Sequence, residues 1–231
     1  MGLKEDLNSE VVSIFRSRWK EEVTNSVPNA EDLLLNSNHS KKLETVAVLY
    51  ADIDGSTSMV DQYPWGFSAE VYKAYLRCAS QIIKSEGGVI TAYDGDRVMG
   101  IFVGSHPRTH AVRASLKINW VVEQIIRPAY TGVYPKLSEN FVLKHVIGID
   151  VSEIHAARIG VHGDNDIVWV GGAANHAAKL CTQTAQPIWI TKPVFDAMGK
   201  EVRYAKNGVD MWSPYTWGGR SIYGTSYVWE L

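Results

Sequence analysis

The sequence predicts an α+β domain with a ferredoxin-like βαββαβ order and a mostly antiparallel sheet. A run of β-branched and apolar residues at 45–53 predicts a buried strand. Two segments with helical periodicity follow strand-like runs, at 64–86 and at 109–126. Between them, Asp94-Gly95 joins two further strand-like runs, which is a strong hairpin signal. This order corresponds to a split βαβ arrangement with both helices on one face of the sheet.

The composition limits the possible classes of protein. The chain has 231 residues, of which 45% are apolar and 21% charged, and this is enough for the core of one full domain plus an extension. The net charge of −2 argues against a nucleic-acid partner, because such a surface needs a basic stripe. No window approaches the roughly 20 apolar residues of a membrane span. We therefore expect a cytoplasmic protein without a membrane span.

The first 43 residues are predicted to form an N-terminal helical arm, and residues 44–231 the main domain. Apolar residues recur at helical spacing between Val11 and Trp19, before Ser-Val-Pro-Asn ends the pattern. An amphipathic helix of this kind normally buries its apolar side. We expect this helix to pack against its own domain.

The second half of the chain is predicted to add strands and one short helix. Three residues that break helices, Pro128, Gly132 and Pro135, predict a long connection after the second helix. Strand-like runs follow at 141–154, at 157–163 and at 167–172. A short helix at 173–180 and a strand at 187–190 precede a tail whose order the sequence does not indicate.

The most informative segment is the acidic end of the first predicted strand. Strand alternation places Tyr50, Asp52 and Asp54 on one face. The following small-residue loop, Gly55-Ser56-Thr57, could hold an anion with its backbone N–H groups. Carboxylates beside a phosphate-sized site suggest a divalent metal that bridges to phosphate oxygens.

A second carboxylate is expected to complete this site. Asp96 lies at the tip of the predicted hairpin, and one helix between two strands covers its distance from Asp52. A lone Asp-Gly is usually only a turn. Two carboxylates at adjacent strand ends favour a metal site.

Three segments resemble the signature regions of the class III nucleotidyl cyclase catalytic domain, over about residues 44–200. They are VLYADIDGSTS, YDGDRVMGIF and VGGAANHAAKL, in the family's order and spacing. The resemblance implies two divalent ions, Mg or Mn, held by Asp52, Asp96 and the carbonyl of Ile53. It also implies a homodimer with two shared active sites, each completed by the second chain.

The third segment supplies the residues that the family uses in the transition state. By resemblance, Asn175 orients the ribose, and Lys179 stands where the family has an arginine. These two residues are four apart on a helix and share a face. A basic residue for the terminal phosphates is expected among Arg203, Lys206 and Arg220 in the tail.

The base-binding positions depart from those of the purine cyclases. The family's lysine and its Asp or Thr are replaced by Ala92 and Val168, which offer the purine edge no hydrogen bonds. Nearby, Tyr50 and Arg97 could address a pyrimidine carbonyl oxygen, and Trp169 could pack on the smaller ring. The combination resembles the stand-alone bacterial pyrimidine cyclases of anti-phage signalling, whose cyclic nucleotides act on a separate effector.

The resemblance thus predicts a pyrimidine nucleotide cyclase that acts on UTP in preference to CTP and releases pyrophosphate by two-metal catalysis. Three alternatives remain open. One is a purine cyclase with an atypical base pocket, and a second is a non-catalytic homologue that binds nucleotide. The third is a haloacid-dehalogenase-type phosphatase with Asp52 as nucleophile and Asp54 as general acid.

Overall fold

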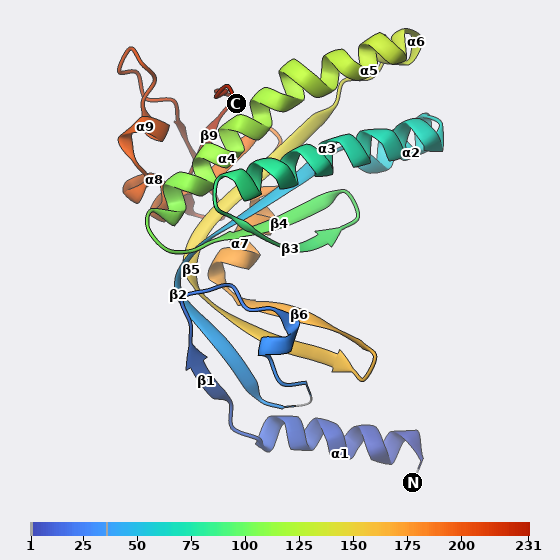
Figure 1. Ribbon diagram of the computed structural model, residues 1–231, viewed down its shortest axis with the longest axis vertical. Coiled ribbons are helices and arrows are strands. Elements are labelled where there is room, and N and C mark those ends of the chain that lie inside the picture. The colour runs from blue at the N-terminus through green and yellow to red at the C-terminus, as the bar shows by residue number, and fades with distance from the viewer. Residues whose placement is uncertain (1, 36) are drawn as a thin grey trace.

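The structure is a computed structural model that describes residues 2–35 and 37–231. Within these residues, nine strands form one sheet in the order β3-β4-β2-β5-β7-β9-β8 (Figure 1). In addition, β1 pairs with β2, and β6 pairs with β5. The strands are β1 (Lys20–Val23), β2 (His39–Asp54), β3 (Val89–Asp94), β4 (Arg97–Phe102), β5 (Lys144–Val161), β6 (Asp164–Gly171), β7 (Ile188–Thr191), β8 (Ser213–Trp217) and β9 (Arg220–Thr225).

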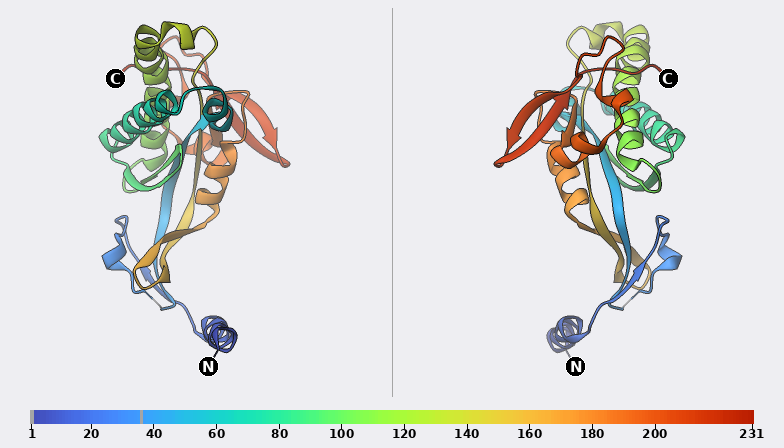
Figure 2. Two further views of the ribbon diagram at one scale, coloured as in Figure 1. Left: turned by 90° about the vertical axis from the view of Figure 1, so that its right-hand side faces the viewer. Right: turned by 90° about the vertical axis from the view of Figure 1, so that its left-hand side faces the viewer.

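The predicted βαββαβ order is confirmed by elements β2 to β5. They follow the chain order β2-α3-β3-β4-α4-β5 and lie in the sheet as β3-β4-β2-β5, all antiparallel. Helices α3 and α4 cover one face, and α7 lies on the other (Figure 2). The helices are α1 (Leu3–Arg16), α2 (Ser56–Gln62), α3 (Trp65–Ser85), α4 (Pro107–Val121), α5 (Arg127–Val133), α6 (Pro135–Ser138), α7 (Gly172–Leu180), α8 (Lys192–Ala197) and α9 (Lys200–Arg203), with 3-10 turn η1 (Ala30–Asp32) and π-helical turn η2 (Val122–Ile126).

Strand β2 sends its side chains alternately into two apolar clusters. Its odd-numbered residues from Ala47 to Ile53 join the core beneath α3 and α4. The even-numbered Val46 and Val48 belong to the cluster that contacts α7. Because successive side chains of a strand point to opposite faces, Asp52 lies on the α7 face of the sheet.

The N-terminal segment differs from expectation. Strand β2 begins at His39 rather than Thr45, so the expected boundary at residue 44 falls inside a strand. A helix forms here, but α1 ends at Arg16, so Trp19 lies beyond it. None of its residues is buried, so the expectation that it packs against its own domain is wrong. The Asn38 side chain donates hydrogen bonds of 3.0 Å and 2.7 Å to the carbonyls of Ile14 and Ser17.

Two predicted breaks in the middle of the chain are also absent. Helix α4 continues through η2 into α5, because the π-helical turn ends just before Pro128 and the proline falls in the first turn of α5. The two strand-like runs after residue 141 form the single strand β5. The long connection is therefore mostly helical.

The tail, whose order the sequence did not indicate, completes the sheet. Strand β7 pairs parallel to β5, and the β8–β9 hairpin extends the sheet beyond it. The rings of Phe195 in α8 and Tyr223 in β9 stack with centroids 3.6 Å apart. The backbone N–H of Trp229 donates to the carbonyl of Leu116 in α4. The chain end is thus fixed against the helical face.

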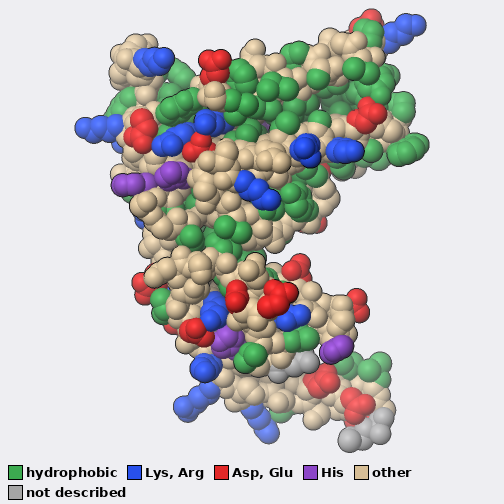
Figure 3. Space-filling model, in the orientation of Figure 1, with side chains coloured by type: hydrophobic (Ala, Val, Ile, Leu, Met, Phe, Trp, Pro, Cys, Tyr) green, Lys and Arg blue, Asp and Glu red, His purple; other side chains and the backbone are tan. Residues whose placement is uncertain are grey.

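The surface carries charges of both signs. On the face shown in Figure 3, Lys and Arg side chains are interspersed with Asp and Glu. Among the described residues, no helix has the length and apolar character that crossing a membrane requires.

Helix α7 depends on a glycine in β5. A Cβ at Gly148 would overlap the backbone carbonyl of Ala177 in α7, whereas a Cβ at Gly132 in α5 meets open space. We expect Gly148→Ala to lower the free energy of unfolding by about 2 kcal/mol or more. Gly132→Ala, the matched control, should leave it equal or slightly higher. Urea unfolding tests both, and equal effects would contradict the close approach.

Candidate functional site

The acidic pair lies at one end of the sheet. Asp52 is near the end of β2, and Asp96 is in the two-residue turn between β3 and β4. Gly95 forms this turn with a φ of 61°. Pairing of β2 with β4 ends at Ala51 and Val98, so Asp52 lies beside the turn. Burial, together with the negative charge of Asp96, raises the pKa of Asp52 to about 6.

These residues fit a divalent cation with hard oxygen ligands. A half-buried carboxylate that a second carboxylate destabilises is stabilised when a cation binds between them. In residues 2–35 and 37–231 there is no cluster of three or more His, Cys, Asp or Glu that could enclose a metal by itself. Magnesium commonly uses only one or two carboxylates and takes its other ligands from substrate and water. The backbone of Ile53 lies beyond the last β4 pair and borders the same edge.

A cationic and an aromatic side chain flank the acidic pair. The guanidinium of Arg97 lies 5.2 Å from the ring centroid of Tyr50 and donates a 2.6 Å hydrogen bond to Asp94. Burial lowers the pKa of Arg97, but the hydrogen bond to Asp94 and the charge of Asp52 raise it overall. Burial also raises the pKa of Tyr50. The Tyr50 hydroxyl therefore stays protonated and can donate a hydrogen bond.

Ala92 lies in the same transverse row as Tyr50. In the register of the sheet, Ala92 is opposite Met99, and Met99 is opposite Tyr50. All three contact the apolar cluster on the α7 face. Ala92 thus presents only a methyl group in the row that contains Tyr50.

The other two candidate base-pocket residues lie elsewhere in the chain. Trp169 pairs with Ala156 of β5, whereas Tyr50 pairs with Gly148, eight residues earlier. Eight residues of strand span about 26 Å, so one chain does not bring Trp169 next to Tyr50. Val168 is exposed and faces away from Trp169 on β6. The Nε1–H of Trp169 is buried and has no hydrogen-bond partner among the described residues.

The expected small-residue loop after β2 is the start of a helix. Gly55 has a φ of 77°, and α2 begins at Ser56. The first backbone hydrogen bond of this turn runs from Met59 N–H to the Gly55 carbonyl. The N–H groups of Ser56 and Thr57 lie in the first turn, where helices have no internal acceptor for them.

Asn175 and Lys179 share the exposed face of α7, as predicted. The opposite face of α7 packs on β5, where Ala177 lies against Gly148. The charges that shift the pKa of Asp52 belong to Asp96, Arg97 and Asp94, and Lys179 is not among them.

The three candidates for binding terminal phosphates lie in different surroundings. Arg203 forms a 3.1 Å ion pair with Asp210 and covers the Phe195 ring on the helical side. Lys206 is exposed in the loop after α9. Arg220, in the β8–β9 hairpin, reaches His176 of α7, the residue that follows Asn175 in the sequence.

Several residues of the site had not been identified from the sequence. The Tyr75 hydroxyl donates to the backbone carbonyl of Asp52 from α3. Asp150 of β5 accepts a hydrogen bond from His176. The position of His176 next to Asn175 was a signal that could have identified it, whereas Tyr75 and Asp150 looked like ordinary members of a helix and a strand.

Comparisons with known proteins show which sequences are similar to this chain. No profile of a known protein family matches the chain. It is 50% identical over 230 residues to a uridylate cyclase of Burkholderia cepacia, covering 100% of this chain and 99% of that one. It is 42% identical over 234 residues to a uridylate cyclase of Xanthomonas perforans, with both chains fully covered.

Solved structures show the same fold at low sequence identity. A bacterial light-regulated adenylyl cyclase aligns with a TM-score of 0.65 at 20% identity, over 79% of this chain and 90% of that one. The guanylyl cyclase Cya2 aligns with a TM-score of 0.65 at 20% identity, over 82% and 94%. The fold is therefore that of the class III cyclase domain, as expected.

The raised pKa of Asp52 predicts that removing its charge increases the free energy of unfolding, and that the increase depends on pH. The pKa of Asp52 in the folded protein is about 6, above the ordinary 3.8. The folded protein therefore loses stability as pH rises from 4 through 6 and this carboxyl becomes charged. We expect Asp52→Asn to raise the free energy of unfolding by about 1 kcal/mol at pH 8 in chelator, and not at pH 4.

Urea unfolding at the two pH values tests this expectation. Asp61→Asn, on the exposed side of α2, is the control and should change little at either pH. Added Mn²⁺ should stabilise the unmodified protein more than Asp52→Asn. A gain of equal size at pH 4 and pH 8 would contradict the electrostatic explanation.

Proposed function

The chain belongs to the uridylate cyclase family, and from this premise we propose that it converts UTP to cyclic 3′,5′-uridine monophosphate and pyrophosphate. It is a nucleotidyl cyclase, a phosphorus–oxygen lyase. The acidic pair Asp52 and Asp96, beside Tyr50 and Arg97, is the observation that carries the assignment of substrate and site.

Asp52, Asp96 and the backbone carbonyl of Ile53 are proposed to hold two divalent ions, Mg or Mn. When bound, such ions make the ribose 3′-hydroxyl more acidic and neutralise charge on the triphosphate. The 3′-oxygen attacks the α-phosphorus, the bond to the leaving pyrophosphate breaks, and the hydroxyl proton is released. The N–H groups of Ser56 and Thr57, following Gly55, would approach the phosphates from the start of α2.

The remaining contacts are proposed to come from a second copy of the chain. Asn175 would orient the ribose, and Lys179 would stabilise negative charge on the α-phosphoryl oxygens. Both side chains are exposed on α7, where a second chain can contact them. A two-fold dimer would bring each α7 to the other chain's acidic pair and form two active sites.

The base pocket is proposed to select a pyrimidine with Tyr50 and Arg97. Arg97 can only donate hydrogen bonds, which suits the O4 carbonyl of uracil better than the 4-amino group of cytosine. Ala92 and Val168 supply no polar group for a purine edge. Trp169 would contribute only from the second chain, because the register separates it from Tyr50.

Arg220 is proposed to bind the terminal phosphates of the substrate. Among the three basic candidates it alone is bonded to α7, next to Asn175. Since nucleoside triphosphates are cytoplasmic metabolites, we place the enzyme in the cytoplasm. Its cyclic nucleotide would serve as a second messenger in anti-phage defence and act on a separate effector.

The alternatives fit the molecule less well. A haloacid-dehalogenase-type phosphatase needs a Rossmann-like alternation of strands and helices, whereas β2 to β5 form an antiparallel βαββαβ unit. A non-catalytic homologue has no need of two carboxylates that repel each other. A purine cyclase would need a donor or acceptor in place of Ala92.

Product analysis tests the substrate directly. The pure protein is incubated with equal amounts of ATP, GTP, CTP and UTP and Mn²⁺, and the products are identified by mass spectrometry. We expect cyclic UMP and pyrophosphate as the main products, and none from Asp52→Ala. Cyclic AMP or cyclic GMP as the main product would overturn the pyrimidine assignment, and free phosphate alone would favour the phosphatase.

Complementation tests the shared sites. Asp96→Ala and Asn175→Ala chains should each be inactive alone, because each lacks one half of both sites. A mixture should regain activity, since each heterodimer contains one site with both residues intact. The control is a mixture of Asp52→Ala with Asp96→Ala, which lose the same half-site and should stay inactive. Heterodimers that form without regaining activity would count against sharing.

A further inference from the structure

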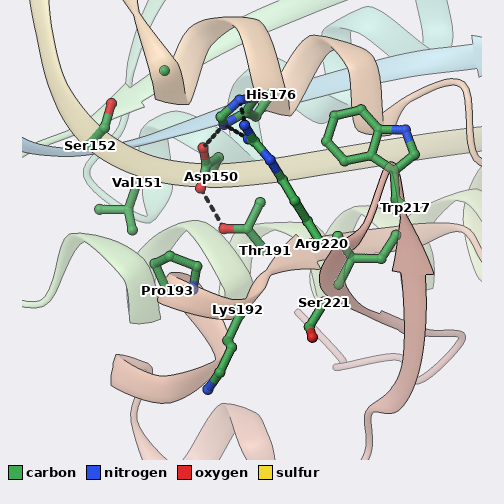
Figure 4. Close-up of a pocket in the computed structure, with 12 residues that line it drawn as sticks. Asp150, Val151, Ser152, His176, Thr191, Lys192, Pro193, Trp217, Arg220 and Ser221 are labelled. Atoms are coloured by element: carbon green, nitrogen blue, oxygen red, sulfur yellow. Dashed lines mark hydrogen bonds and ion pairs between the residues drawn. The ribbon is translucent and has the colours of Figure 1, made fainter.

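A chain of polar contacts connects the core of the sheet to Arg220. Asp150 of β5 is only 4% exposed and accepts a hydrogen bond from the hydroxyl of Thr191 in β7. Its other oxygen lies 2.8 Å from Nδ1 of His176. Nε2 of His176 lies 2.5 Å from a terminal nitrogen of Arg220 (Figure 4). The four side chains come from three strands and one helix.

The two partners of His176 determine its tautomer. A carboxylate can only accept, so Nδ1 carries the proton and donates to Asp150. Arginine can only donate, so Nε2 must be the acceptor. A buried carboxylate behind an imidazole fixes the ring and makes its second nitrogen a better acceptor. Asp150 therefore strengthens the contact between His176 and Arg220.

Arg220 has hydrogen-bond donors that its contact with His176 does not use. In the part of the chain that the structure describes, no carboxylate lies within ion-pair distance of Arg220, unlike Arg97 and Arg203. One of its five N–H donors is used by His176. It borders a cleft of about 380 Å³, and the Trp217 ring lies edge-on to His176 at 6.1 Å. A guanidinium fixed at one corner can present its remaining donors to an anion.

We infer that Asp150 and His176 are positioning residues that hold Arg220 against α7 to receive the terminal phosphates of the nucleotide. This inference rests on the role of Arg220 in the proposed function. His176 acts only through Arg220, so removing either side chain should have the same effect on phosphate binding, and removing both should add nothing.

Pyrophosphate is the probe, because it corresponds to the leaving group and its binding needs no turnover. Binding in the presence of Mn²⁺ is measured by titration calorimetry. We expect Arg220→Ala and His176→Leu each to weaken binding about 10-fold, and the double variant to be no weaker than either alone. Lys192→Met is the matched control, because it removes a charge from the same cleft but is paired with Asp196.

Rescue separates positioning from simple packing. The amide of His176→Gln can donate to Asp150 and accept from Arg220, so this variant should bind pyrophosphate nearly as well as the unmodified protein. The inference is overturned if His176→Leu binds normally, if the two losses multiply, or if His176→Gln is as weak as His176→Leu. It is also overturned if Arg220→Ala binds pyrophosphate as tightly as the unmodified protein does. If the variants bind pyrophosphate as expected but the unmodified protein does not convert UTP, the proposed substrate is wrong and the positioning inference stands.

Discussion

Two carboxylates that repel each other are held together at one end of the sheet, and the rest of the site is arranged around this constraint. The β2–β4 ladder and the β3–β4 turn bring Asp96 close to Asp52, and the half-buried setting raises the pKa of Asp52 to about 6. Such an arrangement opposes stability in the absence of a cation. Its presence in a fold that otherwise buries apolar residues well indicates that binding, rather than stability, accounts for it.

Helix α7 is fixed on the face of the sheet that also carries Asp52. Val46 and Val48 of β2 pack in the cluster that contacts α7, and Asn175 and Lys179 are exposed on that helix. A close approach at Gly148 fixes the helix on β5, with Ala177 against the strand. The exposed side of this helix is what the proposed shared active site takes from the second copy, and the polar contacts from Asp150 to Arg220 anchor the C-terminal hairpin to that helix.

Local signals in the sequence predicted the parts of the fold that depend on local chemistry. The alternation in β2, the Asp94-Gly95 turn and the polar face of α7 were all correct, because periodicity and turn chemistry act over a few residues. The exposed α1, the continuous β5 and the helix through Pro128 were not predicted, because tertiary context decides them. The separation of Trp169 from Tyr50 depends on strand register, which short motifs do not report.

The central claim is that the acidic pair of one chain and α7 of another enclose one nucleotide. A crystal structure with Mn²⁺ and a UTP analogue that cannot cyclise tests it most directly, with anomalous scattering to locate the metal. The account predicts manganese between Asp52 and Asp96 and a ribose in contact with Asn175 of the second chain. Manganese bound elsewhere, or a nucleotide contacted by a single chain, would contradict it.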